Sequence, residues 1–463
     1  MKYNIEKINE IGKMLAEVVT EAMKAEGQAE VRIGDVEMAF RESLREIGRS
    51  ALKCFLENAH GEVGAEVECA CGGKLKYQRR REATIWSVFG KVVYQRAYYA
   101  GCTCGKGQAP VDKRYGIEPG NVTAGLAHLI ALSGIHKAFE EGRKWLQEFL
   151  LFEVSENTVR AETQKMGELQ RQADTRLVKE TQAEAGLQKR ERSQPPTPDI
   201  LYGSMDAAKV RIEPRNEKEK ALENRETWRD LKVGCWYEGE IVPTRHRSVR
   251  QKVQAQREGV VLRAKNQQYF CDIETAEEFG KLLWATGCAV GADRARTLVF
   301  ICDGAVWIWN LIAHYFPNAV QIVDWYHAVD RLKRIAEEAF SNLDERQTWL
   351  EKNTEDLWQG SVETVIEACQ LLAKKSNFAK QSLSYYANNR ERMRYAHFRA
   401  AGYLIGSGVI ESGCKQIVTH RLKLPGAQWQ VDGAVLVAKA RTAWMSGNWK
   451  KLVSARSLLP LAT

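Results

Sequence analysis

The sequence contains no apolar run of the length, about 18 residues, that a membrane-spanning helix requires, so no membrane association is expected. A disulfide framework is not expected either, because the eleven cysteines are odd in number and scattered through a long chain. Residues 1–19 carry acidic side chains throughout an amphipathic helical pattern, which is unlike a signal peptide. Internal repeats and long low-complexity tracts are also absent. These absences predict a cytoplasmic protein.

The chain is long enough for several domains, because its 463 residues exceed the usual domain size of about 50–200 residues. Its 44% apolar and 27% charged residues are ordinary for a globular protein. The formal net charge of +9 favours a polyanionic partner. Most of the thirteen tryptophans are expected to fill cores.

Two helical regions flank a strand-rich module in the first part of the chain. Residues 1–62 and 119–192 show the apolar spacing of helices, and the module between them, 63–118, contains a hairpin pattern over 84–100. The residues Gly90-Lys91 are expected to form its turn.

The second helical region contains a helix, a short break and a second helix over residues 138–167. Ser155 is placed to cap the second helix, and this layout suits a DNA-binding helix-turn-helix. Helical hairpins that only pack against each other are the commoner alternative. In a helix-turn-helix, the polar residues Asn157, Thr158 and Arg160 of the second helix could reach DNA.

A proline-rich linker, residues 193–198, separates these regions from a strand-rich half, because three prolines in six residues cannot continue a helix. Three strand patterns follow, and then helix and strand alternate as far as residue 330. This order predicts an α/β fold with a mixed sheet. Residues 331–399 return to a charged helical pattern.

Three aspartates follow strand patterns in this second half, namely Asp206, Asp303 and Asp324. If the first, fourth and fifth strands are neighbours, these carboxylates meet at one end of the sheet, where ligands bind in α/β proteins. Clustered carboxylates repel one another and therefore need a cation or raised pKa values. Oxygen ligands suit Mg²⁺ or Mn²⁺, and two such ions would support phosphodiester chemistry. Taken singly, each aspartate could instead be a turn former or helix cap.

Glu411 is a candidate third acidic ligand, since it follows the flexible sequence Gly406-Ser407-Gly408 at the start of a helix. Either Asp303 or Asp324 could be the second ligand. Asp303 precedes a glycine that permits a tight turn, whereas Asp324 lies one helical turn before His327 and forms a supporting pair with it. Asp303 is therefore the preferred ligand, with Asp324 and His327 in support.

These motifs resemble those of DDE transposases, which have an RNase H-like catalytic core. The Asp-x-x-His spacing of Asp324 and His327 is similar to the signature of Mutator-like transposases. The stretches "YANNRERMRYAHFRAAGYLIGSGVIES" and "RLKLPGAQW" resemble the ISKra group of bacterial insertion sequences. The resemblance extends from about residue 66 to residue 445.

The resemblance implies that Asp206, Asp303 and Glu411 are a metal-binding catalytic triad. It also implies that residues 331–399 are an all-helical insertion between two parts of the catalytic core, 199–330 and 400–455. The expected partners are transposon ends and target DNA, bound by a homodimer or a higher oligomer associated with the bacterial nucleoid.

Four cysteines surround the predicted hairpin as two Cys-x-Cys pairs, Cys69 with Cys71 and Cys102 with Cys104. A zinc-ribbon-like site would place cysteines here, although each pair is one residue tighter than a Cys-x-x-Cys knuckle. The alternative is a reduced cysteine cluster at the base of the hairpin.

Basic residues near these features are candidate contacts for DNA phosphates. On the hairpin they are Lys74, Lys76, Arg79, Arg80 and Arg81, and around the acidic cluster they are Lys209, Arg211, Lys415, Arg421 and Lys423. The expected activity is metal-dependent DNA nicking followed by strand transfer. The alternatives are a DNA-binding regulator derived from a transposase and an RNase H-like nuclease that does not join strands.

Overall fold

The computed structural model describes residues 13–14, 16–18, 20–21, 32–59, 64–118, 120–183, 198–214, 227–242 and 261–458. Most of the predicted N-terminal amphipathic segment and residues 193–197 of the predicted linker therefore lie outside the described residues. The chain forms two compact units, Met1–Met166 with Lys450–Thr463, and Gly167–Trp449. In the described parts, no helix combines the length and the apolar character that crossing a membrane requires.

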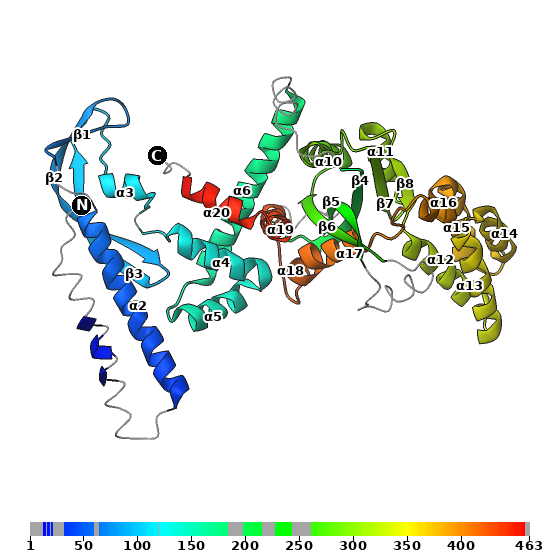
Figure 1. Cartoon of the computed structure of the whole chain (residues 1–463), viewed down its shortest axis with the longest axis horizontal. Coiled ribbons are helices and arrows are strands. Elements are labelled where there is room, and N and C mark those ends of the chain that lie inside the picture. Colours follow the sequence, from blue (N-terminus) through cyan, green and yellow to red (C-terminus); the bar gives the residue numbers. More distant parts are fainter. Residues whose placement is uncertain are drawn as a thin grey trace. The chain divides into compact units, whose positions relative to one another are not determined.

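The first unit is built on a β-hairpin covered by a long helix. Helix α2 (Ile33–Asn58) packs on it through Leu56, and a short strand β1 (Glu66–Glu68) pairs with its edge (Figure 1). Strands β2 (Lys74–Ser87) and β3 (Gly90–Ala100) form the predicted hairpin. The predicted turn at Gly90-Lys91 needs correction, because Ser87 pairs with Gly90 and the turn is formed by Val88 and Phe89. Gly90 begins β3 with a φ of 94°, which suits a residue without a side chain.

A β-bulge divides the hairpin into two ends with separate small cores. Tyr77 pairs with Tyr99 and Arg79 pairs with Tyr98, so Gln78 is an extra residue in β2. Side chains alternate along a strand, and the extra residue reverses that alternation. As a result, the apolar residues at the cysteine end and those at the helix end lie on opposite faces of the hairpin. The two sets are Cys69, Leu75, Ala97 and Tyr99, and Leu56, Ala83, Ile85, Val92 and Tyr94.

Further helices complete the first unit: α3 (Pro110–Tyr115), α4 (Ala124–His136), α5 (Phe139–Leu150), the first turns of α6 (Glu156–Gln182), and α20 (Trp449–Leu458). The predicted cap is confirmed, since the Ser155 hydroxyl accepts the backbone N–H of Thr158 at 3.0 Å. Helix α5 ends at Leu151, which adopts a φ of 59°, so the predicted break between two helices is also confirmed.

The second unit contains a five-stranded mixed sheet, as the sequence predicts. Its strands are β4 (Ile200–Arg211), β5 (Trp228–Val242), β6 (Val261–Asp272), β7 (Thr297–Cys302) and β8 (Val320–Val323), arranged in the order β6-β5-β4-β7-β8. The pairs β4–β5 and β5–β6 are antiparallel, whereas β7 runs parallel to β4, and β8 runs parallel to β7. The first, fourth and fifth strands of this half are therefore adjacent.

Helices cover both faces of this sheet. Helices α10 (Ala276–Val290) and α11 (Val306–Tyr315) cover one face over a cluster of aromatic rings, namely Trp236, Phe270, Phe279, Phe300 and Phe316. The other face is covered by α17 (Gly408–Cys414) and α19 (Val431–Met445). Gly203 on β4 faces Phe300 and Trp236. Asp206 lies three residues further along, so alternation directs it to the opposite face, on the side of α17.

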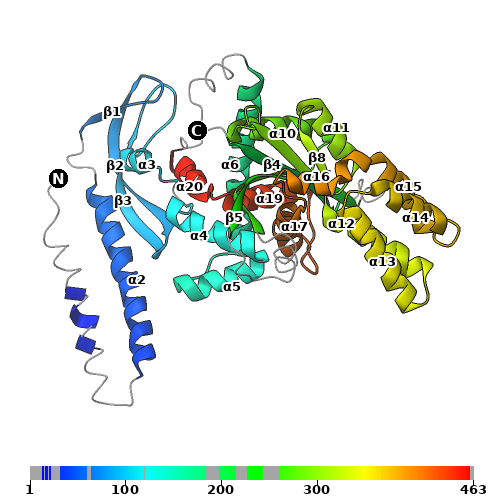
Figure 2. The ribbon, with the colours of Figure 1, turned by 45° about the vertical axis from the view of Figure 1, so that its right-hand side comes forward.

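A group of helices follows β8 and lies beyond that edge of the sheet in both views (Figure 1, Figure 2). Its members are α12 (Trp325–Ala339), α13 (Leu343–Trp358), α14 (Val362–Leu372), α15 (Asn377–Asn388), η1 (Arg390–Met393) and α16 (Tyr395–Ala400). Tyrosine hydroxyls join this group to the ends of the strands, since Tyr395 donates to the Val323 carbonyl at 3.0 Å. The region predicted to be helical, 331–399, consists of helices joined by short turns, and its first helix begins earlier, at Trp325.

Candidate active site

Three aspartates stand level on three neighbouring strands. The parallel register pairs Gly203 with Phe300, so Asp206 and Asp303 each lie three residues beyond a paired position, and the charge of Asp303 acts on the Asp206 carboxyl. Cys302 pairs with Val323, so the next step places Asp303 beside Asp324. One expectation needs correction, because Asp206 lies within β4 and not at its end. Strand β4 continues past Asp206 because its pairing with β5 extends to Arg211, well beyond the end of β7.

Asp206 lies against the helix that carries Glu411. The thiol of Cys414, on α17, is within hydrogen-bonding reach of the Asp206 carboxylate. Burial raises the pKa of Asp206, and the negative charge of Asp303 raises it further. A carboxylate held next to another carboxylate in this way gains stability from a bound cation.

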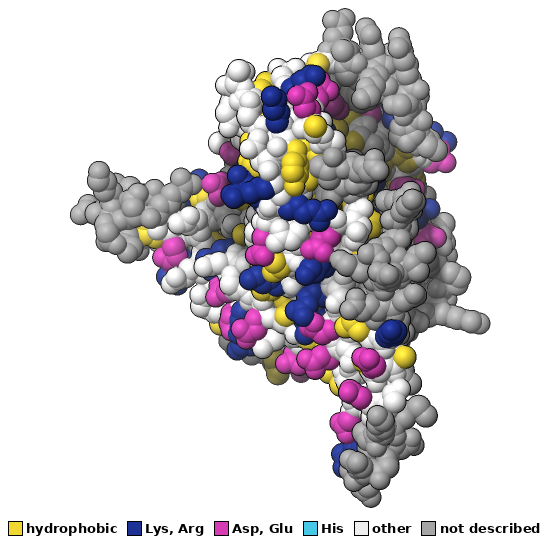
Figure 3. Space-filling view, turned by 90° about the vertical axis from the view of Figure 1, so that its left-hand side faces the viewer, with side chains coloured by type: hydrophobic (Ala, Val, Ile, Leu, Met, Phe, Trp, Pro, Cys, Tyr) yellow, Lys and Arg dark blue, Asp and Glu magenta, His cyan; other side chains and the backbone are white. Residues whose placement is uncertain are grey.

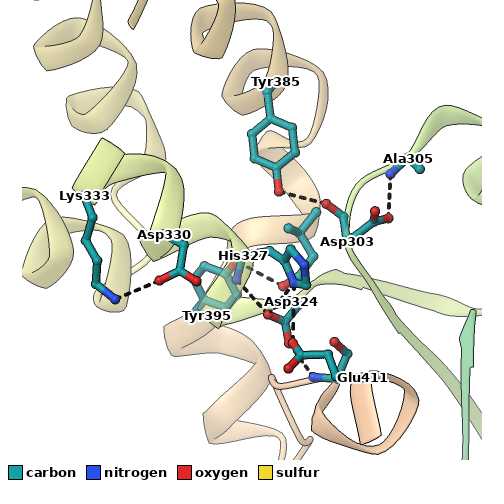
Figure 4. Close-up of polar contacts among 11 residues, drawn as sticks. Asp303, Ala305, Asp324, His327, Asp330, Lys333, Tyr385, Tyr395 and Glu411 are labelled. Carbon is teal, nitrogen blue, oxygen red and sulfur yellow. Dashed lines mark hydrogen bonds and ion pairs between the residues drawn. The ribbon is translucent and has the colours of Figure 1, made fainter. Parts of the chain in front are cut away.

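Asp303 begins a sharp turn whose backbone is held by a tyrosine. Its carboxylate accepts the N–H of Ala305 at 2.9 Å, and its carbonyl accepts the hydroxyl of Tyr385 at 3.0 Å (Figure 4). Between them, Gly304 has a φ of 99°, and a Cβ there would lie 2.7 Å from the Tyr385 ring. The turn therefore requires glycine, as the sequence suggests, and it depends on a side chain from α15.

Asp324 is fully buried and already satisfied by the protein. One oxygen accepts the backbone N–H of His327 at 2.7 Å and contacts its Nδ1 at 3.1 Å, and the other accepts the N–H of Ser407. Burial alone would raise the pKa of Asp324, but these hydrogen bonds outweigh it and hold that pKa below its usual value. This arrangement suits a role for Asp324 in capping α12 and orienting its neighbours. Asp303, which directly follows β7, remains the candidate ligand.

His327 links this buried carboxylate to Glu411. Its Nδ1 lies 3.7 Å from Glu411 Oε1, and its side chain is 45% exposed. The hydrogen bond with Asp324 raises the pKa of His327 to about 9, and the charges of Asp324, Glu411 and Asp303 add to the effect. His327 is therefore protonated at neutral pH while no cation is bound. The protein places this positive charge among the carboxylates.

The close acidic group differs from the predicted ligand set of Asp206, Asp303 and Glu411, because it contains Asp324 and His327 with Glu411. Within the described residues, ligand atoms of Asp324, His327 and Glu411 come within 4.8 Å of one another and could hold a metal ion. Asp206 lies on β4 and Asp303 directly follows β7, and the negative charge of Asp303 raises the pKa of both Asp206 and His327. We call these five side chains the acidic centre; among the described residues, Asp324, His327 and Glu411 are the members grouped closely enough to share a metal ion.

The four predicted cysteines form a compact cluster at the base of the hairpin. Their Sγ atoms are separated by 3.4 Å (Cys69 to Cys71 and Cys71 to Cys102) and 3.5 Å (Cys69 to Cys104). Tetrahedral zinc with Zn–S bonds of about 2.3 Å needs sulfur atoms about 3.8 Å apart, so a small adjustment would admit the ion. Hydrogen bonds from the Cys104 backbone and from the neighbouring thiols lower the pKa of Cys102 to about 6. The cluster could therefore bind zinc, and the tight Cys-x-Cys spacing does not prevent it.

The predicted basic residues of the hairpin are exposed, and the bulge determines which face of β2 each of them occupies. Lys76, Arg79 and Arg81 fall on one face of β2, together with the Tyr98 ring, whose centroid lies 3.7 Å from the Arg81 guanidinium. Arg80 is exposed on the opposite face, and Lys74 pairs with Glu66 at 3.1 Å. Dark blue Lys and Arg side chains, with acidic ones among them, run down this side of the molecule (Figure 3).

Some of the other predicted DNA contacts already have partners within the protein. Lys209 pairs with Asp230 at 2.9 Å, and Arg211 pairs with Glu213 at 2.9 Å. In the helical region, Arg160 pairs with Glu156 at 2.8 Å, and the Thr158 hydroxyl lies 2.8 Å from Ser155 Oγ. The side chains of the predicted contacts Lys209, Arg211, Arg160 and Asn157 are exposed, whereas that of Thr158 is half-buried.

The expectation for Arg421 needs correction, whereas Lys415 and Lys423 are exposed as predicted. Arg421 is only 2% exposed, and its guanidinium lies 5.0 Å from the Trp429 ring centroid. The preceding residues Lys415–Thr419 form a π-helical turn, which holds one more residue than an α-helical turn. The extra residue rotates the following turn, so Arg421 points into the core and cannot serve as a phosphate contact.

Tyr385, Ser407 and Cys414 are residues of the site that the sequence did not single out. Their contacts join residues 82, 83 and about 200 positions apart. No spacing in the sequence indicates such pairs. Comparison with protein-family models and with curated proteins found no match to this chain.

Proposed function

We propose that the chain is a DDE-type transposase that binds the ends of an insertion sequence, nicks the DNA and transfers the freed strand. The observation that carries this proposal is the grouping of Asp324, His327 and Glu411 within 4.8 Å of one another, with Asp206 on β4 and Asp303 directly after β7 close enough to interact with this group through their charges. Three antiparallel strands followed by two parallel ones support an RNase H-like core.

Asp206, Asp303 and Glu411 would hold the divalent cations, with Mg²⁺ or Mn²⁺ favoured by the carboxylate oxygens. When bound, such ions activate water or a 3′-hydroxyl as nucleophile and stabilise the leaving oxygen. The pKa of Asp206 is raised, and the negative charge of Asp303 also raises the pKa of His327. Both effects support a requirement for a cation. If Asp324 and His327 bind an ion directly, Glu411 belongs to both sets.

The remaining residues of the centre position these ligands. Tyr385 and Ala305 fix the turn at Asp303, while Asp324 holds both His327 and the first turn of α17. His327 lies close enough to Glu411 to neutralise part of its charge before substrate binds. Positioning of this kind is the main contribution that a protein makes to phosphoryl transfer.

The cysteine cluster and the basic face of β2 supply the proposed binding module. A zinc ion held by Cys69, Cys71, Cys102 and Cys104 would fix the base of the hairpin, and Lys76, Arg79 and Arg81 would contact phosphates. The helical region around Asn157 would add further contacts. Joining two DNA ends requires at least a dimer on DNA.

The test is a nicking and joining assay on labelled DNA taken from either side of the gene, where the ends of an insertion sequence would lie. The expected result is nicking with Mg²⁺ or Mn²⁺, followed by joining of a pre-cut 3′ end to target DNA. Nicking without joining would favour a nuclease. Metal-independent binding with no nicking would favour a DNA-binding regulator.

A further inference from the structure

One face of α12 carries a row of positive side chains that begins at the acidic centre. His327, Arg331 and Arg334 are spaced by four and three residues, so they share a face of the helix. The row extends about 10 Å from His327 to Arg334 along the helix axis. Arg331 is half-buried and Arg334 is exposed.

Aromatic rings from α15 support both arginines. The Arg331 guanidinium lies 3.9 Å from the Tyr385 ring centroid, and the Arg334 guanidinium lies 4.1 Å from that of Phe378. We call this set of four residues the α12–α15 seam. Arg331 also forms a hydrogen bond with the Tyr385 side chain, but a guanidinium carries five N–H donors, so others remain for a second partner.

Neither arginine forms an ion pair with a carboxylate in the part of the chain that the structure describes. The adjacent Asp330 pairs with Lys333 at 2.7 Å, and Figure 4 draws that pair apart from the acidic cluster. Glu338 is occupied at the start of α15, where it accepts the N–H groups of Asn377 and Phe378 at 2.9 and 3.2 Å. The two positive charges are therefore not neutralised by these nearby carboxylates.

The seam is joined directly to the acidic centre, because the Tyr385 hydroxyl donates to the Asp303 carbonyl. A phosphate approaching the carboxylates is repelled by them, and cations at their border would offset that repulsion. Planar guanidinium groups are well suited to phosphate oxygens.

We infer that the α12–α15 seam binds the sugar–phosphate backbone of the DNA strand that enters the acidic centre. This inference rests on the proposed function and goes beyond it, since it assigns a DNA-binding surface to the helices that follow β8. A role in packing alone is the competing interpretation, because stacked arginines also stabilise helix contacts.

The test measures binding of a short fluorescent DNA duplex of arbitrary sequence over a range of NaCl concentrations, with no divalent cation added. Each duplex phosphate contact that is lost makes the slope of log K against log salt shallower by about 0.9. Arg331→Gln and Arg334→Gln should each reduce the slope by about this amount. Arg334→Lys should retain it, because a lysine still neutralises a phosphate.

The matched control is Lys333→Gln, which removes the same charge from the same helix at a residue paired with Asp330. It should leave the slope unchanged. The inference is overturned if both Gln variants keep the wild-type slope, or if only their melting temperatures change, since that is the result of a packing role. Binding that depends on the seam without any nicking would overturn the proposed activity and leave the seam standing. No binding by the wild-type chain would overturn both.

Discussion

The buried carboxylate of Asp324 accepts the backbone N–H of Ser407, 83 residues further along the chain. This contact joins the start of α12 to the start of α17, and a second one supports it, since the Trp325 N–H donates to the Ile405 carbonyl at 2.9 Å. Gly406 allows the close approach, because a Cβ there would lie 3.0 Å from the Tyr326 ring. The position of Glu411 thus depends on Asp324.

Asp324→Asn should destabilise the protein by about 3 kcal/mol, because an amide cannot accept hydrogen bonds at both of its terminal atoms and a buried interaction is lost. Urea denaturation measures the change. Asp330→Asn, on the exposed side of the same helix, is the control and should cost less than about 1 kcal/mol. Equal effects of the two substitutions would contradict the role assigned to Asp324.

Asp303→Asn should abolish metal-dependent nicking and leave DNA binding and the melting temperature nearly unchanged. The reason is that its carboxylate accepts one backbone N–H, which an Asn side chain can also accept, whereas a neutral amide binds divalent cations poorly. Nicking and binding are measured on the same DNA. Normal cutting by this variant would show that Asp303 is not the second ligand.

Tyr385→Phe should raise the Mg²⁺ concentration needed for half-maximal nicking by about 10-fold, because the residue orients the turn that carries a metal ligand. Its stability should fall by only about 1 kcal/mol, the contribution of one hydrogen bond. The control is Tyr386→Phe, which removes a hydroxyl that donates to the Ala328 carbonyl at 2.8 Å. A change in metal dependence that is the same in both variants would indicate a general effect on packing.

The cysteine cluster should bind one zinc ion per chain, measurable by metal analysis of the purified protein. Cys71→Ser and Cys104→Ser should each lower the zinc content and make the hairpin sensitive to proteolysis, because structural zinc contributes directly to folding. Cys54→Ser provides the control, since that thiol lies on α2 outside the cluster. Full zinc content in the cluster variants would refute the assignment.

The protonation of His327 should make the stability of the cation-free protein depend on pH. The pKa of His327 is raised to about 9 in the folded state, so its contribution is complete below about pH 6.5 and is lost as the pH rises through 9. Because the side chain is 45% exposed, we expect a loss of only about 1–2 kcal/mol. Urea denaturation between these pH values should detect it, and His327→Asn should remove it. A pH dependence that persists in His327→Asn must come from another group.

Much of the second unit could be predicted from the places where apolar runs end. The mixed sheet follows from three strand patterns and the alternation of helix and strand, whereas the adjacency of β4, β7 and β8, which was only a condition in the prediction from sequence, is seen in the structure. The sequence also indicated that Asp324 pairs with His327, but it did not indicate the contact that holds Asp324 to the start of α17. Asp324 became an orienting residue because the chain returns to it at Ser407, and no local pattern encodes a contact over that distance.

The error at Arg421 has a local cause, and an insertion in β2 has an effect of the same kind. Arg421 lies in a basic stretch that reads as surface, but the π-helical turn before it changes which face it occupies. In β2, the extra residue Gln78 places Leu75 and Ile85 on opposite faces although both are odd-numbered. One additional residue in a helix or a strand reverses an assignment made by counting.

The extra residue in β2 also constrains how this module could change during evolution or design. Without Gln78, Leu75 would turn toward the side occupied by Ala83, and the sulfur cluster would lose the apolar floor formed by Leu75 and Tyr99. Insertions and deletions between the two ends must therefore come in pairs to be tolerated, whereas substitutions there need only keep a β-compatible side chain.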